Sequence, residues 1–187
     1  LGVVRSKVRY MQLGCFQGLH SLLQLDLSRN LLRSLNDSMF QELVSLKRLD
    51  ISRNPLKEIQ EDAFRGLKRL RFLDLSGNRL NFLGSNTFSH LISLRDLLLN
   101  SNYIRRIHPN AFSGLPSLKS LELPYTQKKG STDVALMTLQ RLDNFEGPGY
   151  LACEGVQITR TLVLIGADSL IPAYIEECLK QITYVRE

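Results

Sequence analysis

The sequence predicts an α/β repeat solenoid, in which short strands stack side by side into one parallel sheet. Three observations lead to this fold class. A unit of 24 residues recurs along roughly the first two-thirds of the 187-residue chain. Each unit holds a Leu-x-Leu segment whose alternation has the period of a β-strand. Each full unit also carries one Asn and one Phe at fixed places, and a unit that cannot bury its apolar face alone is expected to stack on its neighbours.

The strand and the turn behind it form the first part of each unit. The segment Leu25–Leu35 reads LDLSRNLLRSL, and its counterparts open at Leu49, Leu73 and Leu97. Alternating leucines place one face of the strand in the core. The Asn side chain has two donors and an acceptor for backbone groups that the turn leaves unpaired. We therefore expect a ladder of structural asparagines, namely Asn30, Asn54, Asn78 and Asn102.

A phenylalanine column follows the turn in each unit. Each ring can bury about 150–250 Å², and we expect the rings to form a stacked spine on the far side of the solenoid from the sheet. The column consists of Phe16, Phe40, Phe64, Phe88 and Phe112.

The full pattern, L-x-x-L-x-L-x-x-N-x-L, resembles the leucine-rich repeat family over about residues 1–123. Units that contain F-x-x-L, such as Phe40–Leu43 and Phe64–Leu67, are similar to the typical extracellular repeat of animal receptors and adhesion proteins. The resemblance implies a horseshoe with a parallel concave sheet and convex loops or short helices. It also implies a non-enzymatic module outside the cell that binds a protein ligand or co-receptor, needs no cofactor, and reaches a membrane only through a segment missing from this chain.

The strand residues that point away from the core are mostly polar, as expected for a solvated sheet face. Phe72, Leu98 and Tyr125 are exceptions on three successive strands, and we expect one apolar patch there with Arg48 and Arg53 beside it. Aromatic residues and Arg are favoured at interface hot spots. The alternatives are isolated exposed apolar residues, which are normal, or contact with the tail. The predicted ligand-binding residues are Arg29, Arg48, Arg53, Phe72, Asp96, Leu98, Asn100 and Tyr125.

The net charge of +6 belongs to the repeats, because residues 1–123 hold 18 Lys and Arg against 10 Asp and Glu. Two basic columns are predicted to line opposite rims of the strand face. One contains Lys47, Arg71, Arg95 and Lys119, and the other contains Arg33, Lys57 and Arg105. An anionic partner such as a sulfated glycan or an acidic protein is one interpretation. The other is a solvated rim that keeps a leucine-rich protein soluble. A nucleic-acid partner is not expected.

The repeat ends near Tyr125, which predicts repeats over residues 1–125 and a small α+β C-terminal cap over 126–187. The tail pattern predicts a helix over 132–143, a turn over 146–149, a strand over 156–165 and a last helix from about 168. The family cap usually carries a C-x-C pair that is missing here, so the tail is either a divergent cap or an unrelated one. The chain has no signal peptide or membrane-spanning run and starts inside a repeat, which indicates a fragment. Its uncapped first repeat offers a possible homodimer contact.

Three cysteines exclude complete intrachain pairing. Cys15 shares a column with small or apolar residues and is predicted to be a buried free thiol, while Cys153 and Cys178 are predicted to form a disulfide. The sequon Asn36-Asp37-Ser38 lies in an exposed loop and predicts glycosylation at Asn36. These features agree with an extracellular protein. The competing interpretation is a cytosolic scaffold or adaptor with all three thiols reduced.

No arrangement of residues points to an enzyme. His20, His90 and His108 occupy different repeat columns, and no cysteine lies near them in sequence. The chain has no C-x-x-C, no H-E-x-x-H and no Gly-rich phosphate loop. Stacked carboxylates at Asp26, Asp50, Asp74 and Glu122 suggest a metal ladder at first sight. However, Leu98 interrupts the column, and single spaced carboxylates make poor cages. We therefore expect neither catalysis nor a bound metal.

Overall fold

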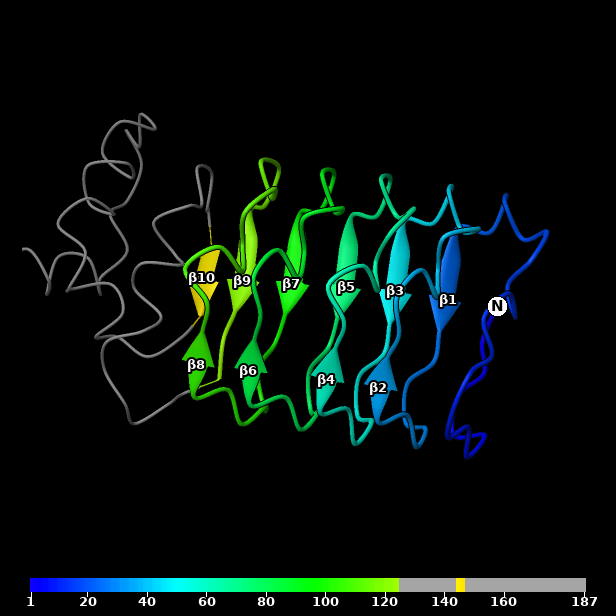
Figure 1. Cartoon of the computed structure of the whole chain (residues 1–187), viewed down its shortest axis with the longest axis horizontal. Coiled ribbons are helices and arrows are strands. Elements are labelled where there is room, and N and C mark those ends of the chain that lie inside the picture. The colour runs from blue at the N-terminus through cyan, green and yellow to red at the C-terminus, as the bar shows by residue number, and fades with distance from the viewer. Residues whose placement is uncertain (125–143, 147–187) are drawn as a thin grey trace, which may run out of the picture.

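The computed structural model describes residues 1–124 and 144–146, in which the chain winds into a solenoid of stacked coils (Figure 1). One edge of every coil is a strand of a six-stranded parallel sheet, in the order β1-β3-β5-β7-β9-β10. The strands are β1 (Gln24–Asp26), β3 (Arg48–Asp50), β5 (Phe72–Asp74), β7 (Asp96–Leu98), β9 (Ser120–Glu122) and β10 (Asn144–Glu146). The predicted repeat solenoid is confirmed.

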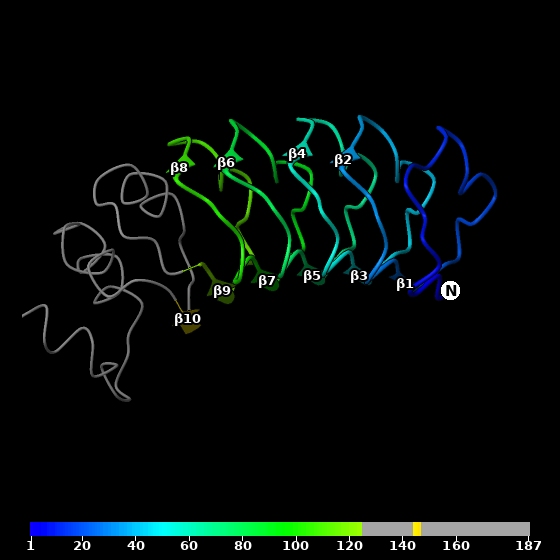
Figure 2. The same ribbon diagram turned by 90° about the horizontal axis from the view of Figure 1, so that it is seen from below.

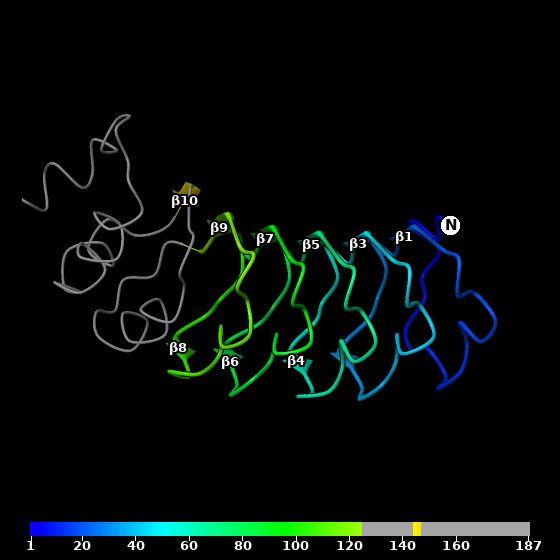
Figure 3. The same cartoon turned by 90° about the horizontal axis from the view of Figure 1, so that it is seen from above.

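A second row of very short strands lies on the other side of the coil from the long sheet (Figures 2 and 3). Its strands pair in parallel as β2 with β4 and β6 with β8. They are β2 (Ser34–Leu35), β4 (Glu58–Ile59), β6 (Phe82–Leu83) and β8 (Arg106–Ile107). Turns complete each coil, and residues 1–124 and 144–146 contain no helix. The convex side was predicted to hold loops or short helices. In this part of the chain it consists of turns and the very short strands.

The sheet register equals the sequence repeat. Gln24 pairs with Arg48, Leu25 with Leu49, and the following strands keep the same offset of one unit. Each column of the sequence thus becomes a row of touching residues along the solenoid axis. The leucine columns fill the interior, where side chains such as Leu49, Leu73 and Leu97 are at most 1% exposed.

The asparagine ladder ties each coil to the one before it. Asn54 is 3% exposed, and its Nδ2 donates to the carbonyl of Ile51 in its own coil and to that of Leu27 in the preceding coil, both at 3.0 Å. Its Oδ1 accepts the N–H of Leu32, also in the preceding coil, at 3.1 Å. Asn78 and Asn102 repeat this arrangement, as does Asn30 against the first coil. The predicted role of this column in the turn is confirmed.

The acidic column closes the other half of each turn. Oδ1 of Asp26, Asp50 and Asp74 accepts the N–H of the serine two residues later, at 2.8–2.9 Å. A short aspartate side chain that binds backbone two residues on is the usual basis of an Asx turn. These carboxylates therefore have a local structural role in ending the strand.

The phenylalanine rings form the predicted spine. The centroids of successive rings from Phe16 to Phe112 lie 5.8–6.3 Å apart, with interplanar angles of 5–23°. Four of the five rings are completely buried. Each ring packs against the ring of the next coil. The spine therefore holds neighbouring coils together on the side of the solenoid where few backbone hydrogen bonds join them.

The first coil is only partly closed over. An isolated parallel bridge joins Gly2 to Asp26, and Val3, Val8 and Met11 are half-buried against the core. Cys15 is exposed and free, so the prediction of a buried thiol is wrong. The equivalent residues Met39 and Ala63 are packed between two described coils and are buried, whereas Cys15 belongs to the first described coil.

Strand β10 extends the sheet past the end of the recognisable repeat. Asn144, Phe145 and Glu146 pair in parallel with Ser120, Leu121 and Glu122. The sequence analysis missed this strand, because three residues with one apolar position give no measurable period. The predicted tail helices, the strand over 156–165, Tyr125, Cys153 and Cys178 lie outside the described residues.

Replacement of Asn54 by Ala tests the ladder. The change leaves the buried Leu32 N–H without its acceptor and removes one of the two amide donors to each of the carbonyls of Leu27 and Ile51. We therefore expect the free energy of unfolding to fall by about 1–3 kcal/mol. Chemical denaturation measures it. Asn81 is exposed, and Asn81→Ala should change stability by less than about 0.5 kcal/mol. Equal effects of the two substitutions would contradict this role of the ladder.

Candidate functional site

The outer face of the long sheet presents two rows of side chains. The first row runs Gln24, Arg48, Phe72, Asp96 and Ser120, and the second runs Asp26, Asp50, Asp74, Leu98 and Glu122. Every residue between the two rows, such as Leu73 and Leu97, points inward and is buried. All ten outer residues are exposed or half-buried, so this face is available for contact.

Arg48 and Phe72 interact directly across β3 and β5. The Arg48 guanidinium carbon lies 3.6 Å from the centroid of the Phe72 ring, which is close contact for a cation–π pair. The ring is half-buried as a result. The Arg48 guanidinium therefore lies over the Phe72 ring on the outer face of the sheet.

Leu98 lies on the neighbouring strand, diagonally from Phe72. Phe72 pairs with Asp96, and Leu98 pairs with Asp74, so the two apolar side chains are diagonal neighbours on one face, with Cα atoms about 7–8 Å apart. The structure therefore brings together Arg48, Phe72 and Leu98, which we call the β5–β7 patch. Asp96 lies at its edge, and Tyr125, the third predicted apolar member, falls outside the described residues.

Asn100 adds an unpaired acceptor beside this patch. In the three preceding coils an aspartate caps the N–H two residues later, but Leu98 stands where the fourth aspartate would be. Asn100 Oδ1 is buried and has no hydrogen-bond partner in the described part of the chain. Such atoms are rare in native proteins because an unpaired buried acceptor is costly. The sequence signal was the substitution of Leu for Asp and of Asn for Ser in one unit.

The two predicted basic rims are exposed columns in different places. Lys47, Arg71, Arg95 and Lys119 immediately precede the sheet strands, and backbone hydrogen bonds join each of them to the next. Arg33, Lys57 and Arg105 immediately precede β2, β4 and β8, so this column borders the second row. Arg9 belongs to the same repeat column and was missed by the sequence analysis.

Arg29 and Arg53 do not lie on the β5–β7 patch. Both occupy the turn after a strand, with φ of 57° and 55°, and both are exposed. Arg53, and then Arg5, lower the pKa of Arg29 by charge repulsion. These arginines form a separate stack one coil apart.

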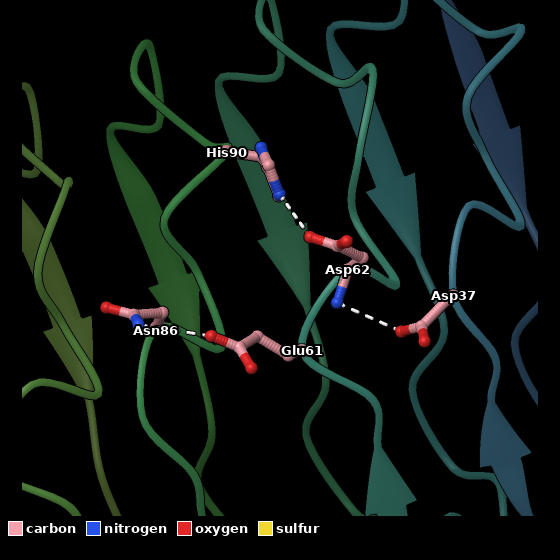
Figure 4. Close-up of polar contacts among 5 residues, drawn as sticks. All are labelled: Asp37, Glu61, Asp62, Asn86 and His90. Carbon is pink, nitrogen blue, oxygen red and sulfur yellow. Dashed lines mark hydrogen bonds and ion pairs between the residues drawn. The ribbon is translucent and has the colours of Figure 1, made fainter.

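A polar network links three coils away from the sheet (Figure 4). His90 Nε2 lies 2.7 Å from Asp62 Oδ1, and the Asp62 N–H donates to Asp37 Oδ1 at 3.0 Å. Asn86 Nδ2 donates to Glu61 Oε1 at 3.1 Å. A histidine beside carboxylates can serve catalysis, but no Ser, Thr or Cys side chain bonds to this His90 among the described residues. The network joins neighbouring coils. The sequence pattern did not predict it, because each of its contacts joins residues of two different repeat columns.

The remaining site predictions concern modification and metal. Asn36 is exposed directly after β2, so the sequon is accessible, and its glycosylation stays a prediction. Residues 1–124 and 144–146 hold no group of three or more His, Cys, Asp or Glu side chains placed to bind a metal ion. In the same part of the chain, no helix is long and apolar enough to cross a bilayer.

Comparison with known proteins agrees with this geometry. The family model described as leucine rich repeat matches residues 1–56, 30–80 and 75–127. The chain belongs to the leucine-rich repeat family. A chain of the solved Toll–Spatzle complex from Drosophila is similar in structure, with a TM-score of 0.69 and 22% identity. The likeness covers 78% of this chain and 21% of that chain, so this leucine-rich repeat chain spans about a fifth of its neighbour's length. No curated protein matches the sequence significantly.

Replacement of His90 by Ala tests whether the network is structural. The ion pair with Asp62 is partly exposed, so we expect a loss of about 0.2–1 kcal/mol in the free energy of unfolding, measured by denaturant titration. Asp62→Ala should have a similar effect, because it removes the same contact with His90 while its backbone N–H can still donate to Asp37. A loss above about 3 kcal/mol for His90→Ala would contradict an auxiliary role.

Proposed function

We propose that this chain is a non-enzymatic recognition module that binds a protein ligand on the outer face of its parallel sheet. The observation that carries the proposal is the β5–β7 patch, where Arg48 is stacked on Phe72 and Leu98 lies diagonally beside them. Aromatic residues and Arg are the side chains that protein interfaces use as anchors. Here they are presented on a hydrogen-bonded sheet, which limits the ordering cost of binding.

The surroundings of the patch support a protein ligand over a small molecule. Asp50, Asp74 and Asp96 provide a polar border, as interface rims do. The hollow of about 320 Å³ on this face is lined by Leu1, Gln24, Asp26, Arg48 and Asp50 and does not include Phe72 or Leu98. The two apolar side chains are thus presented on the open sheet, which suits an extended contact surface, whereas small-molecule sites are usually concave and enclosed.

We place the module outside the cell, as part of a receptor, adhesion or secreted protein. The F-x-x-L repeat subclass and the accessible Asn36 sequon support this assignment. The similar solved structure is the Toll–Spatzle complex, a molecular hub in Drosophila development and innate immunity. We infer by analogy that this chain also serves as the ligand-binding part of a larger protein. The second candidate is an intracellular scaffold, which the same surface would suit.

The double substitution Phe72→Asp with Leu98→Asp tests the patch. Two hot-spot residues are lost and two charges are added, so we expect affinity for the cognate ligand to fall by about 100-fold or more. A panel of purified ectodomains and secreted proteins, screened by biolayer interferometry, supplies the ligand. Unfolding midpoints should stay near that of the wild type, because both side chains are partly solvated.

Phe82→Asp is the matched control for this test. Phe82 is 43% exposed and lies on β6 in the second row, and the Arg106 guanidinium carbon is 5.6 Å from its ring centroid. It therefore repeats the exposed Phe–Arg pair on the opposite side of the coil. We expect it to leave binding unchanged. A ligand that tolerates the double substitution but loses affinity with Phe82→Asp would contradict the proposed surface.

A count of free thiols tests the extracellular assignment. Cys15 is exposed, so its thiol should be alkylated in the native protein. Partial burial raises the pKa of this thiol, so the reaction needs a mildly alkaline pH. We expect one free thiol in protein from its native source that is denatured without reduction, because Cys153 and Cys178 are predicted to be bridged. Mass spectrometry of the alkylated chain gives the count. Three free thiols would instead favour the intracellular scaffold.

A further inference from the structure

The turns that follow the first three strand positions form a strongly basic surface. Residues 5–9, 29–33 and 53–57 occupy the same place in consecutive coils and contain seven Lys and Arg but no Asp or Glu. All seven are exposed. The equivalent turns 77–81 and 101–105 hold one basic residue each. We call this surface the basic edge, and it comprises Arg5, Lys7, Arg9, Arg29, Arg33, Arg53 and Lys57.

The basic edge is built on a rigid backbone. The N–H of Arg5 donates to the carbonyl of Ser28 at 3.2 Å, and that of Arg29 donates to the carbonyl of Ser52 at 2.9 Å. Asn30 and Asn54 hold the same turns from inside through their Oδ1 and Nδ2 atoms. The arginine Cα atoms are therefore stacked at the spacing of neighbouring strands, about 4.8 Å.

Backbone geometry gives no reason for arginine at these positions. Arg5, Arg29 and Arg53 have φ of 53°, 57° and 55°, in the left-handed region that residues with a Cβ disfavour. Gly77 takes the same place in the next coil with φ of 65°, and glycine adopts this conformation without steric cost. The three arginines thus occupy positions at which glycine would give a less strained backbone.

The stacked guanidinium groups have no carboxylate partner. No Arg–carboxylate ion pair involves Arg5, Arg29 or Arg53 among the described residues, and the nearby Asp26 and Asp50 each direct Oδ1 to the N–H of a serine. The repulsion is strong enough that Arg53 and Arg5 lower the pKa of Arg29. An anion placed between successive arginines would remove this repulsion.

We propose that the basic edge binds the sulfate groups of a linear sulfated polysaccharide lying along the solenoid axis. A guanidinium fork matches a tetrahedral oxyanion, and two forks from adjacent coils are close enough to share one such group. The edge holds no aromatic residue, whereas single-stranded nucleic acid is usually bound by stacking on aromatic side chains. Carboxylates on one face of an extended acidic peptide repeat at about 6.6–6.8 Å, which does not match the coil spacing. The inference is independent of the proposed protein-binding patch, which lies on another surface.

The test compares two triple variants that lose the same charge. The edge variant carries Arg5→Gly, Arg29→Gly and Arg53→Gly, with Gly77 as the structural precedent. The control variant carries Lys47→Ser, Arg71→Ser and Arg95→Ser in the exposed column before the sheet strands. The probe is a heparin oligosaccharide, with unsulfated heparosan, polyaspartate and oligothymidylate of similar length as comparisons. Surface plasmon resonance gives each Kd at two salt concentrations, since attraction between exposed charges is screened by salt.

We expect the wild type to bind heparin and the edge variant to bind it about tenfold or more weakly, because three exposed charge contacts are lost. The control variant should lose less than about threefold. Equal weakening of the two variants, absence of heparin binding by the wild type, or equal affinity for polyaspartate or oligothymidylate would each overturn the proposal. The unfolding midpoint of the edge variant should be at least that of the wild type. If it falls, serine replaces glycine at the same three positions in the same comparison, since Ser101 adopts this turn conformation with φ of 55°.

Discussion

The rest of the structure depends on a single repeated hydrogen-bonding unit, the buried asparagine that binds its own coil and the one before it. A strand of three residues pairs too briefly to be stable alone, and a coil of 24 residues cannot bury its own leucines. Asn54 links Ile51, Leu27 and Leu32 in one arrangement, so it fixes the offset between coils as well as the turn. Once that offset is fixed, each leucine and each Phe packs against the equivalent residue of the next coil.

A fixed offset also turns sequence columns into surfaces. A residue that departs from the repeat then changes the surface at one place only, because its neighbours in the adjacent coils keep the repeat residue. Leu98 replaces an aspartate that elsewhere accepts the N–H two residues later, and Asn100 replaces a serine. An apolar side chain and an amide oxygen without a partner among the described residues therefore lie in the same coil. Where the same residue type recurs in consecutive coils, its property accumulates along the solenoid. Arginine in three consecutive turns therefore concentrates positive charge at one edge. The chain thereby carries two chemically different surfaces on one scaffold.

The two surfaces differ in how they hold their side chains. On the sheet, the Arg48 guanidinium carbon lies 3.6 Å from the Phe72 ring centroid, and a pair that is already in contact loses less freedom on binding a protein surface. At the edge, Arg29 and Arg53 are exposed and repel each other. Such a surface responds to charge and salt more than to shape. A recognition module with both could select a protein partner on one face while being retained by a polyanion on another.

The sequence by itself determined the repeat length, the asparagine ladder, the phenylalanine spine and the inward leucines, because each depends on a residue type that recurs at a fixed spacing. Only the tertiary structure decided features that depend on what lies beside a residue. Cys15 follows its column in sequence yet is exposed, whereas Met39 and Ala63 of the same column are buried between two described coils. Strand β10 forms because an edge of β9 is available to pair with Asn144–Glu146, which have no strand period of their own. The contacts of Arg48 with Phe72 and of His90 with Asp62 join residues 24 and 28 positions apart, and their geometry exists only once the coils are stacked.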